Sequence, residues 1–411
     1  MFGIFYILTL LLVRHYSWRD PTSVFFDPET AYDPIYSVVR EKQAVEFMQQ
    51  FHGFPGGNDK PGGKKICLGM ASIARKGVRY FRAAVGSLLD GLDEIERSQI
   101  HLILFIAHTD PSVHPAYNES WLHDAADTVL LYDLDPDTLS HVRALETSGF
   151  TQEKALFDYN YLLQSCIATE LPYIAMMEDD ILALDGWFHR TRSALEMAES
   201  RSEKPFLYLR LFYTEQFLGW NSENWAIYFF WSLWTVLIPT SALLLIRRCA
   251  PNYHAMLSDR RIFMLTFVCI PLCILLFFAA GRATVLPIPA GVNQMNDFAC
   301  CGQGLVFPQV KAQNLSRWYE MNLAYFDVRK NGLADMLTEE YAKEHEEVRW
   351  AITPNVIQHV GRKSTKQKDQ SDRPHPLTEA EKMFNFKFEL NDAGRLRREH
   401  ERVLREMKAG K

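Results

Sequence analysis

Two long runs without charge dominate the pattern of hydrophobic and polar positions along the chain. Residues 225–246, WAIYFFWSLWTVLIPTSALLLI, and residues 262–280, IFMLTFVCIPLCILLFFAA, contain no charged side chain. A helix needs roughly 20 apolar residues to cross a bilayer, and globular helices of that length usually have a polar face. The pattern therefore predicts a two-helix transmembrane hairpin over 225–280, with a pair of buried core helices as the alternative.

The loop between the two runs indicates an orientation. Residues 247–261, RRCAPNYHAMLSDRR, carry one arginine pair against each helix end. Because loops rich in arginine and lysine stay on the cytoplasmic side of a membrane, we expect this loop in the cytoplasm and the rest of the chain in the lumen. The N-terminal residues 1–13 are also apolar but short, so they predict a signal anchor or a semi-buried anchor.

The sequons and the cysteines also bear on which parts of the chain face the lumen. Two N-x-S/T sequons begin at Asn118 and Asn314, on the two sides of the hairpin that are expected in the lumen, which makes both candidate glycosylation sites. Four cysteines lie outside the hairpin and could form disulfides in an oxidising compartment, with their pairing left open; they are Cys67, Cys166, Cys300 and Cys301.

The remaining pattern alternates between strand-like and helix-like segments. Helical spacing occurs over 36–51, 78–92 and 151–169. Apolar runs typical of strands occur over 66–73, 99–108, 128–134, 172–177 and 206–212, and after the hairpin over 282–289 and 302–308. Such alternation predicts an α/β fold, a mostly parallel sheet with helices on both faces. Ligands of such sheets bind at the carboxyl ends of the strands.

The domain boundaries follow from these segments. We expect one catalytic domain that the hairpin interrupts, preceded by a stem with an amphipathic helix and followed by a charged, mostly solvated tail. The ranges are 1–13 for the anchor, 14–59 for the stem, 60–224 and 281–365 for the two parts of the domain, 225–280 for the hairpin and 366–411 for the tail. The net charge of −6 argues against a broadly basic nucleic-acid binder.

Three adjacent acids give the sharpest chemical signal. Glu178, Asp179 and Asp180 directly follow the strand-like run 172–177. Carboxylates so close together repel each other unless a cation or hydrogen-bond donors compensate, and their oxygens suit Mn²⁺ or Mg²⁺. A metal site that binds a diphosphate is one interpretation, and a solvated acidic loop at the start of a helix is the other.

Two further residues join this candidate site. His359, in PNVIQHVG, follows a short apolar run and could complete a metal site through an imidazole nitrogen, although a structural hydrogen-bonding role is the commoner one for a single histidine. Asp158 lies four residues after Lys154. It is either half of a surface ion pair or a residue that faces the ligand edge of the sheet and holds the nucleotide end of a donor.

These motifs carry a family resemblance. The stretch 151–187 with its E-D-D triplet, together with PNVIQHVGRKST, resembles the GT-A fold glycosyltransferases, including the N-acetylglucosaminyltransferase IV enzymes. With the hairpin inserted after LFYTEQFLGW, the layout over about residues 60–365 resembles the post-GPI attachment to proteins factor 4 family. The resemblance implies a Golgi enzyme that transfers N-acetylgalactosamine from a UDP-sugar donor to the glycan of membrane-held GPI anchors.

The resemblance also implies roles for particular residues. Glu178 and Asp179 would contact the ribose and the sugar of the donor, while Asp180 and His359 would hold Mn²⁺ on its diphosphate. If transfer inverts the anomeric centre, a carboxylate must accept the proton of the acceptor hydroxyl. We expect Glu215 in this role, with Asp297 as the second choice.

Two other functions remain compatible with the sequence. The same fold could act on a different lipid-linked or protein-linked glycan, or it could serve as a non-catalytic membrane scaffold. The scaffold hypothesis implies that the acids and His359 are dispensable, yet the chain retains all of them.

Overall fold

A computed structural model describes residues 2–54, 63–75, 77, 79–148, 151–254, 256–295, 301–326, 332–361 and 380–409 of the chain. Its elements fall into two compact units. The membrane unit consists of Met1–Asp33 and Glu215–Ile288, and the sheet unit consists of Pro34–Thr214 and Pro289–Lys411. Each unit is described by itself.

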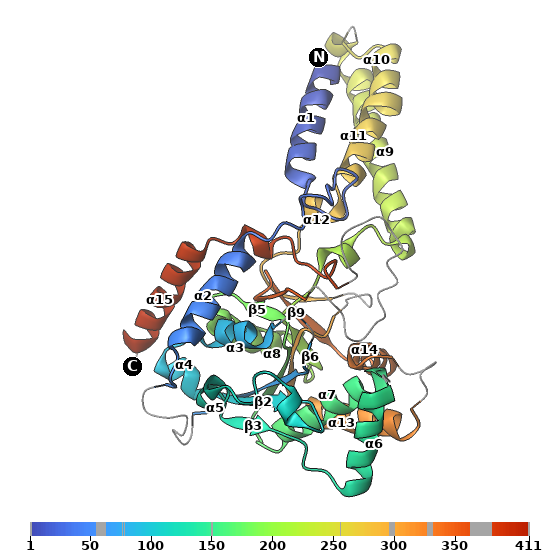
Figure 1. Ribbon diagram of the computed structural model, residues 1–411. Coiled ribbons are helices and arrows are strands. Elements are labelled where there is room, and N and C mark those ends of the chain that lie inside the picture. The colour runs from blue at the N-terminus through green and yellow to red at the C-terminus, as the bar shows by residue number, and fades with distance from the viewer. Residues whose placement is uncertain are drawn as a thin grey trace. The chain divides into compact units, whose positions relative to one another are not determined.

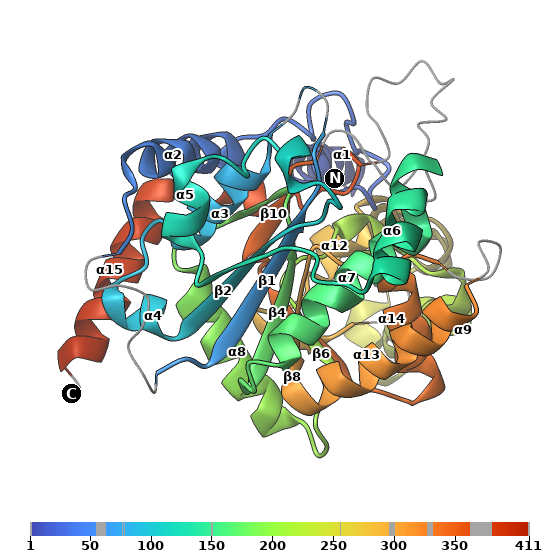
Figure 2. The ribbon, with the colours of Figure 1, turned by 60° about the horizontal axis from the view of Figure 1, so that its bottom comes forward.

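The sheet unit is built on an eight-stranded sheet in the described part of the chain, with the order β3-β2-β1-β4-β8-β6-β9-β7 (Figures 1 and 2). The strands β3, β2, β1 and β4 run parallel, as do β6 and β9, whereas β8 and β7 are antiparallel to their neighbours. The bounds are β1 Ile66–Ser72, β2 Ile100–Ile106, β3 Thr128–Leu130, β4 Tyr173–Glu178, β6 Tyr208–Arg210, β7 Gly291–Gln294, β8 Gly304–Pro308 and β9 Arg349–Thr353. The sheet thus combines strands from both sides of the hairpin, and the predicted α/β fold with a mostly parallel sheet is confirmed.

Helices cover both faces of the sheet (Figure 1). One face packs against α2, α3, α5, α8 and α15, and the other against α7, α13 and α14. The bounds are α2 Tyr36–Gln50, α3 Phe81–Leu89, α4 Glu94–Ser98, α5 Ser120–Ala125, α6 Pro136–Ser148, α7 Thr151–Ile167, α8 Trp187–Arg201, α13 Gln309–Ala324, α14 Ala334–Glu344 and α15 Ala393–Ala409.

Strand β1 shows how the sequence divides its side chains between the two cores. Leu68 and Met70 belong to the core beneath α3 and α8, while Cys67 belongs to the core beneath α7, because successive side chains of a strand point to opposite faces. At Gly69 a Cβ atom would lie 3.0 Å from Leu162 of α7, so glycine allows this helix to approach the strand closely. Cys67 also forms a disulfide with Cys166 of α7, one of the disulfides that the sequence allowed.

A second, two-stranded sheet extends from the acidic triplet. Strand β5 (Ile181–Ala183) pairs antiparallel with β10 (Ile357–His359), so that His359 lies opposite Ile181. The N–H group of Val360 then donates a hydrogen bond to the carbonyl oxygen of Asp180 at 2.9 Å. This pairing brings the late histidine motif beside the acidic triplet, nearly 180 residues away in the chain.

The C-terminal segment corrects the expectation of a solvated tail. Phe386, Phe388 and Leu396 are buried in the sheet unit, because this segment supplies apolar side chains that cover the edge of β5 and β10. The side chain of Gln358 donates to the carbonyl of Asn385 and to Glu389, at 3.0 and 2.7 Å. We call residues 383–400 the C-terminal brace. Only the outer face of α15 is solvated, and residues 362–379 lie outside the described part.

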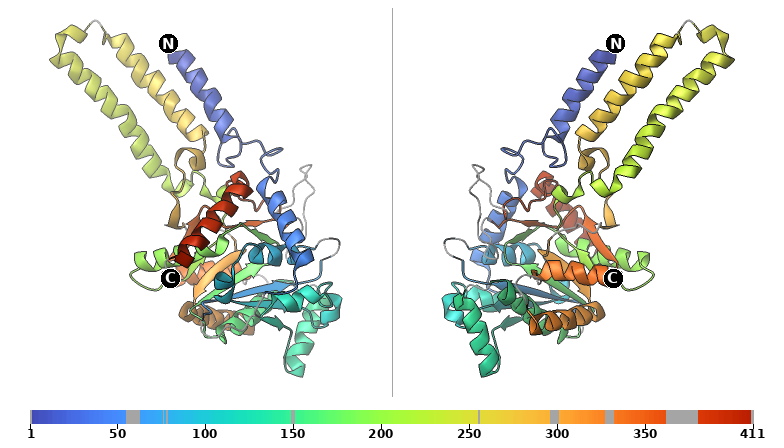
Figure 3. Two further views of the ribbon diagram at one scale, coloured as in Figure 1. Left: turned by 90° about the vertical axis from the view of Figure 1, so that its left-hand side faces the viewer. Right: turned by 90° about the vertical axis from the view of Figure 1, so that its right-hand side faces the viewer.

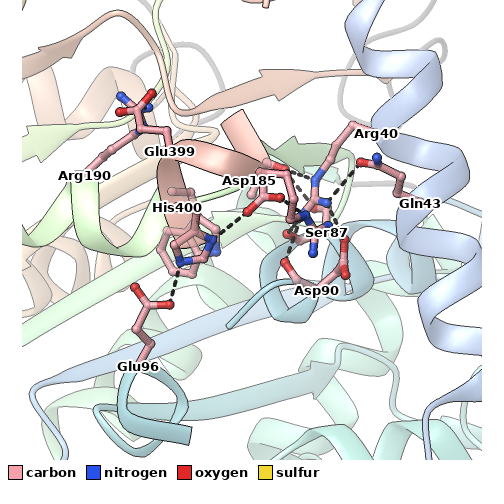
Figure 4. Close-up of polar contacts among 12 residues, drawn as sticks. Arg40, Gln43, Ser87, Asp90, Glu96, Asp185, Arg190, Glu399 and His400 are labelled. Carbon is pink, nitrogen blue, oxygen red and sulfur yellow. Dashed lines mark hydrogen bonds and ion pairs between the residues drawn. The ribbon is translucent and has the colours of Figure 1, made fainter. Parts of the chain in front are cut away.

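Buried charges fasten the brace to the sheet unit (Figure 4). His400 of α15 lies between two carboxylates, with Nδ1 at 2.6 Å from Asp185 and Nε2 at 2.9 Å from Glu96. The guanidinium of Arg397 reaches Asp90 at 2.8 Å and also contacts Asp185. We call His400, Asp185 and Glu96 the brace cluster. Its three side chains are at most 2 % exposed, so charge pairing rather than solvent stabilises them.

The membrane unit contains the predicted hairpin (Figure 3). Helix α9 (Trp225–Cys249) forms the first arm, and α10 (Asp259–Met264), a π-helical turn (Leu265–Cys269) and α11 (Ile270–Ala279) form the second. Both arms are long and apolar enough to cross a membrane. The hydroxyls of Thr240 and Thr266 lie 3.0 Å apart across the hairpin. The outer surface of α9 is exposed, as lipid contact requires and a soluble core does not.

A third apolar helix accompanies the hairpin. Helix α1 (Phe2–Ser17) lies beside α11, where the Tyr6 hydroxyl donates to the carbonyl of Leu272 at 3.1 Å. The strand expected over 282–289 is wrong, because α12 (Arg282–Val285) begins there. The Asp20 carboxylate accepts from both the backbone N–H and the hydroxyl of Thr284 at 2.7 Å, which favours a helical turn.

The two sequons lie in different local structures. Asn118 is exposed in a turn that precedes α5, as a glycosylation acceptor should be. Asn314 instead lies within α13, and the hydroxyl of Ser316, the third residue of its sequon, is buried and donates to Asn160 at 2.8 Å. The structure therefore favours Asn118 over Asn314 as the acceptor.

Candidate functional site

The acidic triplet lies at the carboxyl edge of the sheet. Glu178 ends β4 and pairs in register with Ala71 of β1, so the end of β1 at Ser72 lies next to Asp179. The N–H of Glu178 donates to the carbonyl of Gln303 at 3.1 Å, which joins the other neighbour of β4 to the same edge. The parallel strands thus bring together polar residues at the edge where ligands of α/β sheets bind.

Asp179 is a buried carboxylate with two donors. The hydroxyl of Ser72 donates to its Oδ2 at 2.5 Å, and the guanidinium of Arg75 donates to the same oxygen at 2.6 Å. Burial raises the pKa of Asp179, and the positive charge of Arg75 opposes that rise. Arg75 also lies 3.8 Å from Asp180, so this one cation offsets part of the repulsion between the two acids.

His114 supports Asp179 through Ser72. Its Nδ1 accepts a hydrogen bond from the backbone N–H of Ala116 at 3.1 Å, so the neutral ring carries its proton on Nε2. That nitrogen lies 3.0 Å from the Ser72 hydroxyl, to which it donates. Burial, together with the smaller effect of nearby His108, lowers the pKa of His114 to about 4, so the neutral ring persists at neutral pH. The chain of donors from His114 to Ser72 to Asp179 therefore orients that carboxylate.

Asp180 faces His359 across a narrow space. Its Oδ2 lies 3.6 Å from Nε2 of His359, and both side chains are buried. The Nδ1 atom of His359 lies 3.0 Å from the carbonyl oxygen of Met383 in the C-terminal brace. A Cβ atom at Gly361 would lie 2.5 Å from Asp180 and 2.6 Å from His359, so only glycine fits there. We call Asp180 and His359 the edge pair.

The chemistry of the edge pair suits a divalent cation. A carbonyl oxygen only accepts, so Nδ1 of His359 carries a proton and the neutral ring directs the lone pair of Nε2 at Asp180. Burial alone would lower the pKa of His359, but the Asp180 carboxylate raises it, so either a proton or a cation must satisfy the pair. A histidine oriented by a carbonyl is the usual arrangement of a metal ligand. Among the described residues no cluster of three or more His, Cys, Asp or Glu could hold a metal, so oxygens of a bound substrate would have to complete the coordination.

Asp158 lies in a separate buried group. The Lys154 ammonium contacts both of its oxygens, at 2.9 and 2.7 Å, and the Tyr132 hydroxyl donates to it as well. Burial raises the pKa of Asp158 to about 6 against the opposing charge of Lys154. Lys154 also donates to the carbonyl of Ala107 just beyond β2 at 3.0 Å. These contacts favour a structural role for Asp158 at the ends of β2 and β3, rather than contact with a donor.

The structure does not test the two candidate bases. Glu215 is buried at the first residue of the short 3₁₀ helix Glu215–Leu218, in the membrane unit rather than the sheet unit. Asp297 lies outside the described residues. Both assignments stay predictions.

Several residues of the site carried no clear signal in the sequence. Ser72 and Arg75 lie at and after the end of β1 and His114 follows β2, so the pairing of β1 with both β2 and β4 brings them to the acidic triplet. Two buried polar atoms beside the site, the Tyr159 hydroxyl and Oε1 of Gln303, have no hydrogen-bond partner in the described part of the chain. Burial raises the pKa of Tyr159 well above its usual value, with Glu178 among the charges that contribute. Unpaired groups of this kind are available to a ligand.

A comparison with protein families identifies the chain. The family model of the GPI-N-acetylgalactosamine transferase PGAP4 matches residues 66–358, well over half of the sequence. The chain belongs to this family. The matched range runs from β1 through the acidic triplet and the hairpin and ends at Gln358, one residue before His359. The suspected family is thereby confirmed, and the family description implies a glycosyltransferase. A search of curated proteins finds no match.

Proposed function

We propose that this protein is a metal-dependent glycosyltransferase that moves N-acetylgalactosamine from a UDP-sugar donor to the glycan of GPI anchors. The observation that carries the proposal is the edge pair: a buried carboxylate and a carbonyl-oriented imidazole nitrogen, 3.6 Å apart, at the ligand edge of the sheet. This pair lies within a chain whose family is described as a GPI-N-acetylgalactosamine transferase.

The residues at the edge have complementary tasks in this proposal. Asp180 and His359 would hold Mn²⁺, or Mg²⁺, at the diphosphate of the donor. When bound, the cation would neutralise the negative charge that develops on the departing UDP. Asp179, fixed by Ser72 and Arg75, presents its other oxygen to the sugar or ribose, and Glu178 contacts the same part of the donor.

Two further roles complete the proposal. Either Glu215 or Asp297 accepts the proton of the acceptor hydroxyl in an inverting transfer. Arg75 keeps a positive charge beside the two buried acids, which limits their mutual repulsion before the donor binds.

We place the protein in a Golgi membrane, and its topology supports a site on the lumenal side. The disulfide between Cys67 and Cys166 belongs to the sheet unit, and disulfides persist in oxidising compartments. The arginines at the turn of the hairpin favour the cytoplasmic side for that turn. The sheet unit is joined to the opposite ends of both arms, so it belongs on the lumenal side in this orientation.

Turnover by the purified full-length protein tests the proposal. The protein in lipid nanodiscs is mixed with UDP-N-acetylgalactosamine and a GPI glycolipid, with Mn²⁺ or with a chelator, and the glycan is weighed by mass spectrometry. We expect one added N-acetylhexosamine that requires both metal and donor. Addition of the sugar at the same rate with the chelator would refute the proposed metal dependence. An unchanged glycan under all conditions would refute the proposed transferase activity.

A further inference from the structure

The membrane unit contains a cavity at one end of α1. It has a volume of about 790 Å³ and is lined by residues of α1 and of the segment that follows it: Leu11, Arg14, His15, Trp18, Val24, Phe25, Phe26, Asp27 and Thr30. Its wall combines aromatic and aliphatic side chains with polar ones, and it carries a cation, Arg14, and a carboxylate, Asp27, as its formal charges at neutral pH. The sheet-edge site does not account for this cavity.

The contacts of α1 place the cavity at the level where the membrane spans end. Tyr6 contacts Leu272, and eight residues of helix advance each chain by about 12 Å. Arg14 is therefore level with Ala280, just beyond α11. Ser23 donates to the carbonyl of Ala279 at 2.9 Å, which fixes the following segment at the same level. In a bilayer that the hairpin crosses, the lipid phosphates would lie at this level, where arginine and tryptophan side chains are favoured.

The two charges of the cavity differ in how they are satisfied. Arg14 has no hydrogen-bond or ion-pair partner in the described part of the chain, and its side chain is exposed to the cavity. Asp27 accepts from the N–H of Glu29 and the hydroxyl of Thr30, at 3.2 and 2.8 Å, but no cation neutralises it there. A ligand with one anionic and one cationic group would therefore complement both, and the ring of Phe25 in the cavity wall offers apolar surface to a sugar or inositol ring.

We propose that this cavity binds the lipid-proximal end of the glycolipid acceptor. The phosphodiester contacts Arg14, the amino group of the adjacent glucosamine contacts Asp27, and the inositol ring lies between them against the aromatic wall. The inference rests on the proposed function for the identity of the acceptor. It assigns a second substrate site to the membrane unit, separate from the donor site in the sheet unit. The acyl chains remain in the bilayer beside α1.

Kinetics with two acceptors test the assignment. One acceptor is the intact glycolipid in nanodiscs, and the other is the same glycan without phosphodiester or lipid. We expect Arg14→Gln to raise the KM of the glycolipid about tenfold or more, the usual size of a lost charge-assisted hydrogen bond. It should leave the KM of the free glycan and both kcat values unchanged. The matched control is Arg248→Gln, which removes an exposed arginine from the other end of the unit and should change neither constant.

The second charge has its own test. Asp27→Asn, which keeps an acceptor oxygen for Thr30, should raise the KM of a glycolipid with free glucosamine severalfold. It should leave unchanged the KM of the same glycolipid with N-acetylated glucosamine, which has no positive charge. Equal effects on the two would overturn the assignment of Asp27.

Direct binding keeps the inference separate from the transferase proposal. Native mass spectrometry would measure retention of glucosaminyl-phosphatidylinositol by the full-length protein in competition with phosphatidylcholine, with no donor present. We expect the wild-type protein to prefer the glucosaminyl lipid and Arg14→Gln to lose that preference. Equal retention of both lipids by the wild-type protein would mean general contact with bulk lipid and would overturn the inference, whether or not transfer is observed.

Discussion

The sheet unit contains two buried clusters in which a histidine meets carboxylates, and they differ in how the second ring nitrogen is used. In the brace cluster both nitrogens of His400 face carboxylates within 3 Å, so the ring is closed on both sides. In the edge pair one nitrogen of His359 is taken by the carbonyl of Met383, and the other is 3.6 Å from Asp180. A proton on the ring of His400 is sufficient to satisfy the brace cluster. In the edge pair, an ion can bridge the 3.6 Å between His359 and Asp180.

The surroundings of the two clusters also indicate a structural role for the brace cluster and a ligand-binding role for the edge pair. The brace cluster adds Arg397 to its carboxylates and joins α15 to the core. The edge pair lies at the carboxyl ends of parallel strands, next to a glycine where any side chain would collide with both members. Similar residue types therefore serve stability in one place and ligand binding in the other, and geometry rather than composition separates the two roles.

Removing the histidine of the brace cluster should produce the largest change in stability. His400→Leu leaves the buried Asp185 and Glu96 without their shared cation, and breaking a buried ion pair typically costs roughly 3–5 kcal/mol. Chemical denaturation should show this loss, while turnover per folded molecule stays near that of the wild-type protein. The control is His141→Leu, which breaks a largely exposed pair with Glu153. If the two variants were equally stable, the brace cluster would not be structural.

At the edge pair we expect a substitution to lower turnover and to leave stability nearly unchanged. Asp180→Asn keeps the shape of the side chain but removes the charge that would bind a cation, so turnover should fall roughly 100- to 1,000-fold. The free energy of unfolding should change little, because the charge that is removed also repels the buried carboxylate of Asp179. Asp137→Asn, at an exposed position in the first turn of α6, should affect neither property. Full turnover by Asp180→Asn would remove this residue from the site.

Stability should depend on pH through the brace cluster. Burial alone would lower the pKa of His400, but its hydrogen bonds to Asp185 and Glu96 raise it to about 9. A histidine with a raised pKa stabilises the fold fully below its unfolded pKa of about 6.5 and loses that contribution as the pH rises through about 9. We expect a loss of roughly 3 kcal/mol over this range. Denaturation of His400→Leu should show a much flatter profile, and equal slopes would contradict the assignment.

The smallest of these effects should come from a single methyl group. Gly361→Ala places a Cβ atom against Asp180 and His359 and should force them apart. We expect turnover to fall about tenfold, since small displacements of positioned groups are costly. Gly394→Ala, near the start of α15, serves as the control, because its Cβ atom would approach only the end of the flexible Arg398 side chain closely, at 3.2 Å, and would lie at an ordinary contact distance of 3.6 Å from Asp392. Wild-type turnover by Gly361→Ala would show that the spacing of the edge pair is not critical.

The periodic parts of the chain could be predicted from the sequence, and the contacts between distant segments could not. The length of the two runs without charge was sufficient to predict the hairpin. The apolar runs that alternate with helical segments were sufficient to predict β1, β2 and β4. The misassigned strand over 282–289 lies where the Asp20 side chain stabilises a helical turn, an interaction across more than 260 residues. The brace was missed because its charges suggested solvent, whereas His400 and Arg397 are paired with carboxylates of the core.

The candidate site shows the same division. The acidic triplet and His359 stand out as motifs, but Ser72, Arg75 and His114 belong to the site only because β1 lies between β2 and β4 in this register. The structure also separates Asp158 from the acids, because Lys154 and Tyr132 already occupy its carboxylate.

Metal dependence of His359→Ala tests the central claim most directly, namely that the edge pair is the cation site of a glycosyltransferase. Transfer of N-acetylgalactosamine to the glycolipid would be measured over a range of Mn²⁺ concentrations for the wild-type protein and the variant. We predict that both require Mn²⁺ and that the variant needs roughly 10- to 100-fold more to reach half of its maximum rate. Identical Mn²⁺ dependence in the two proteins would contradict the account.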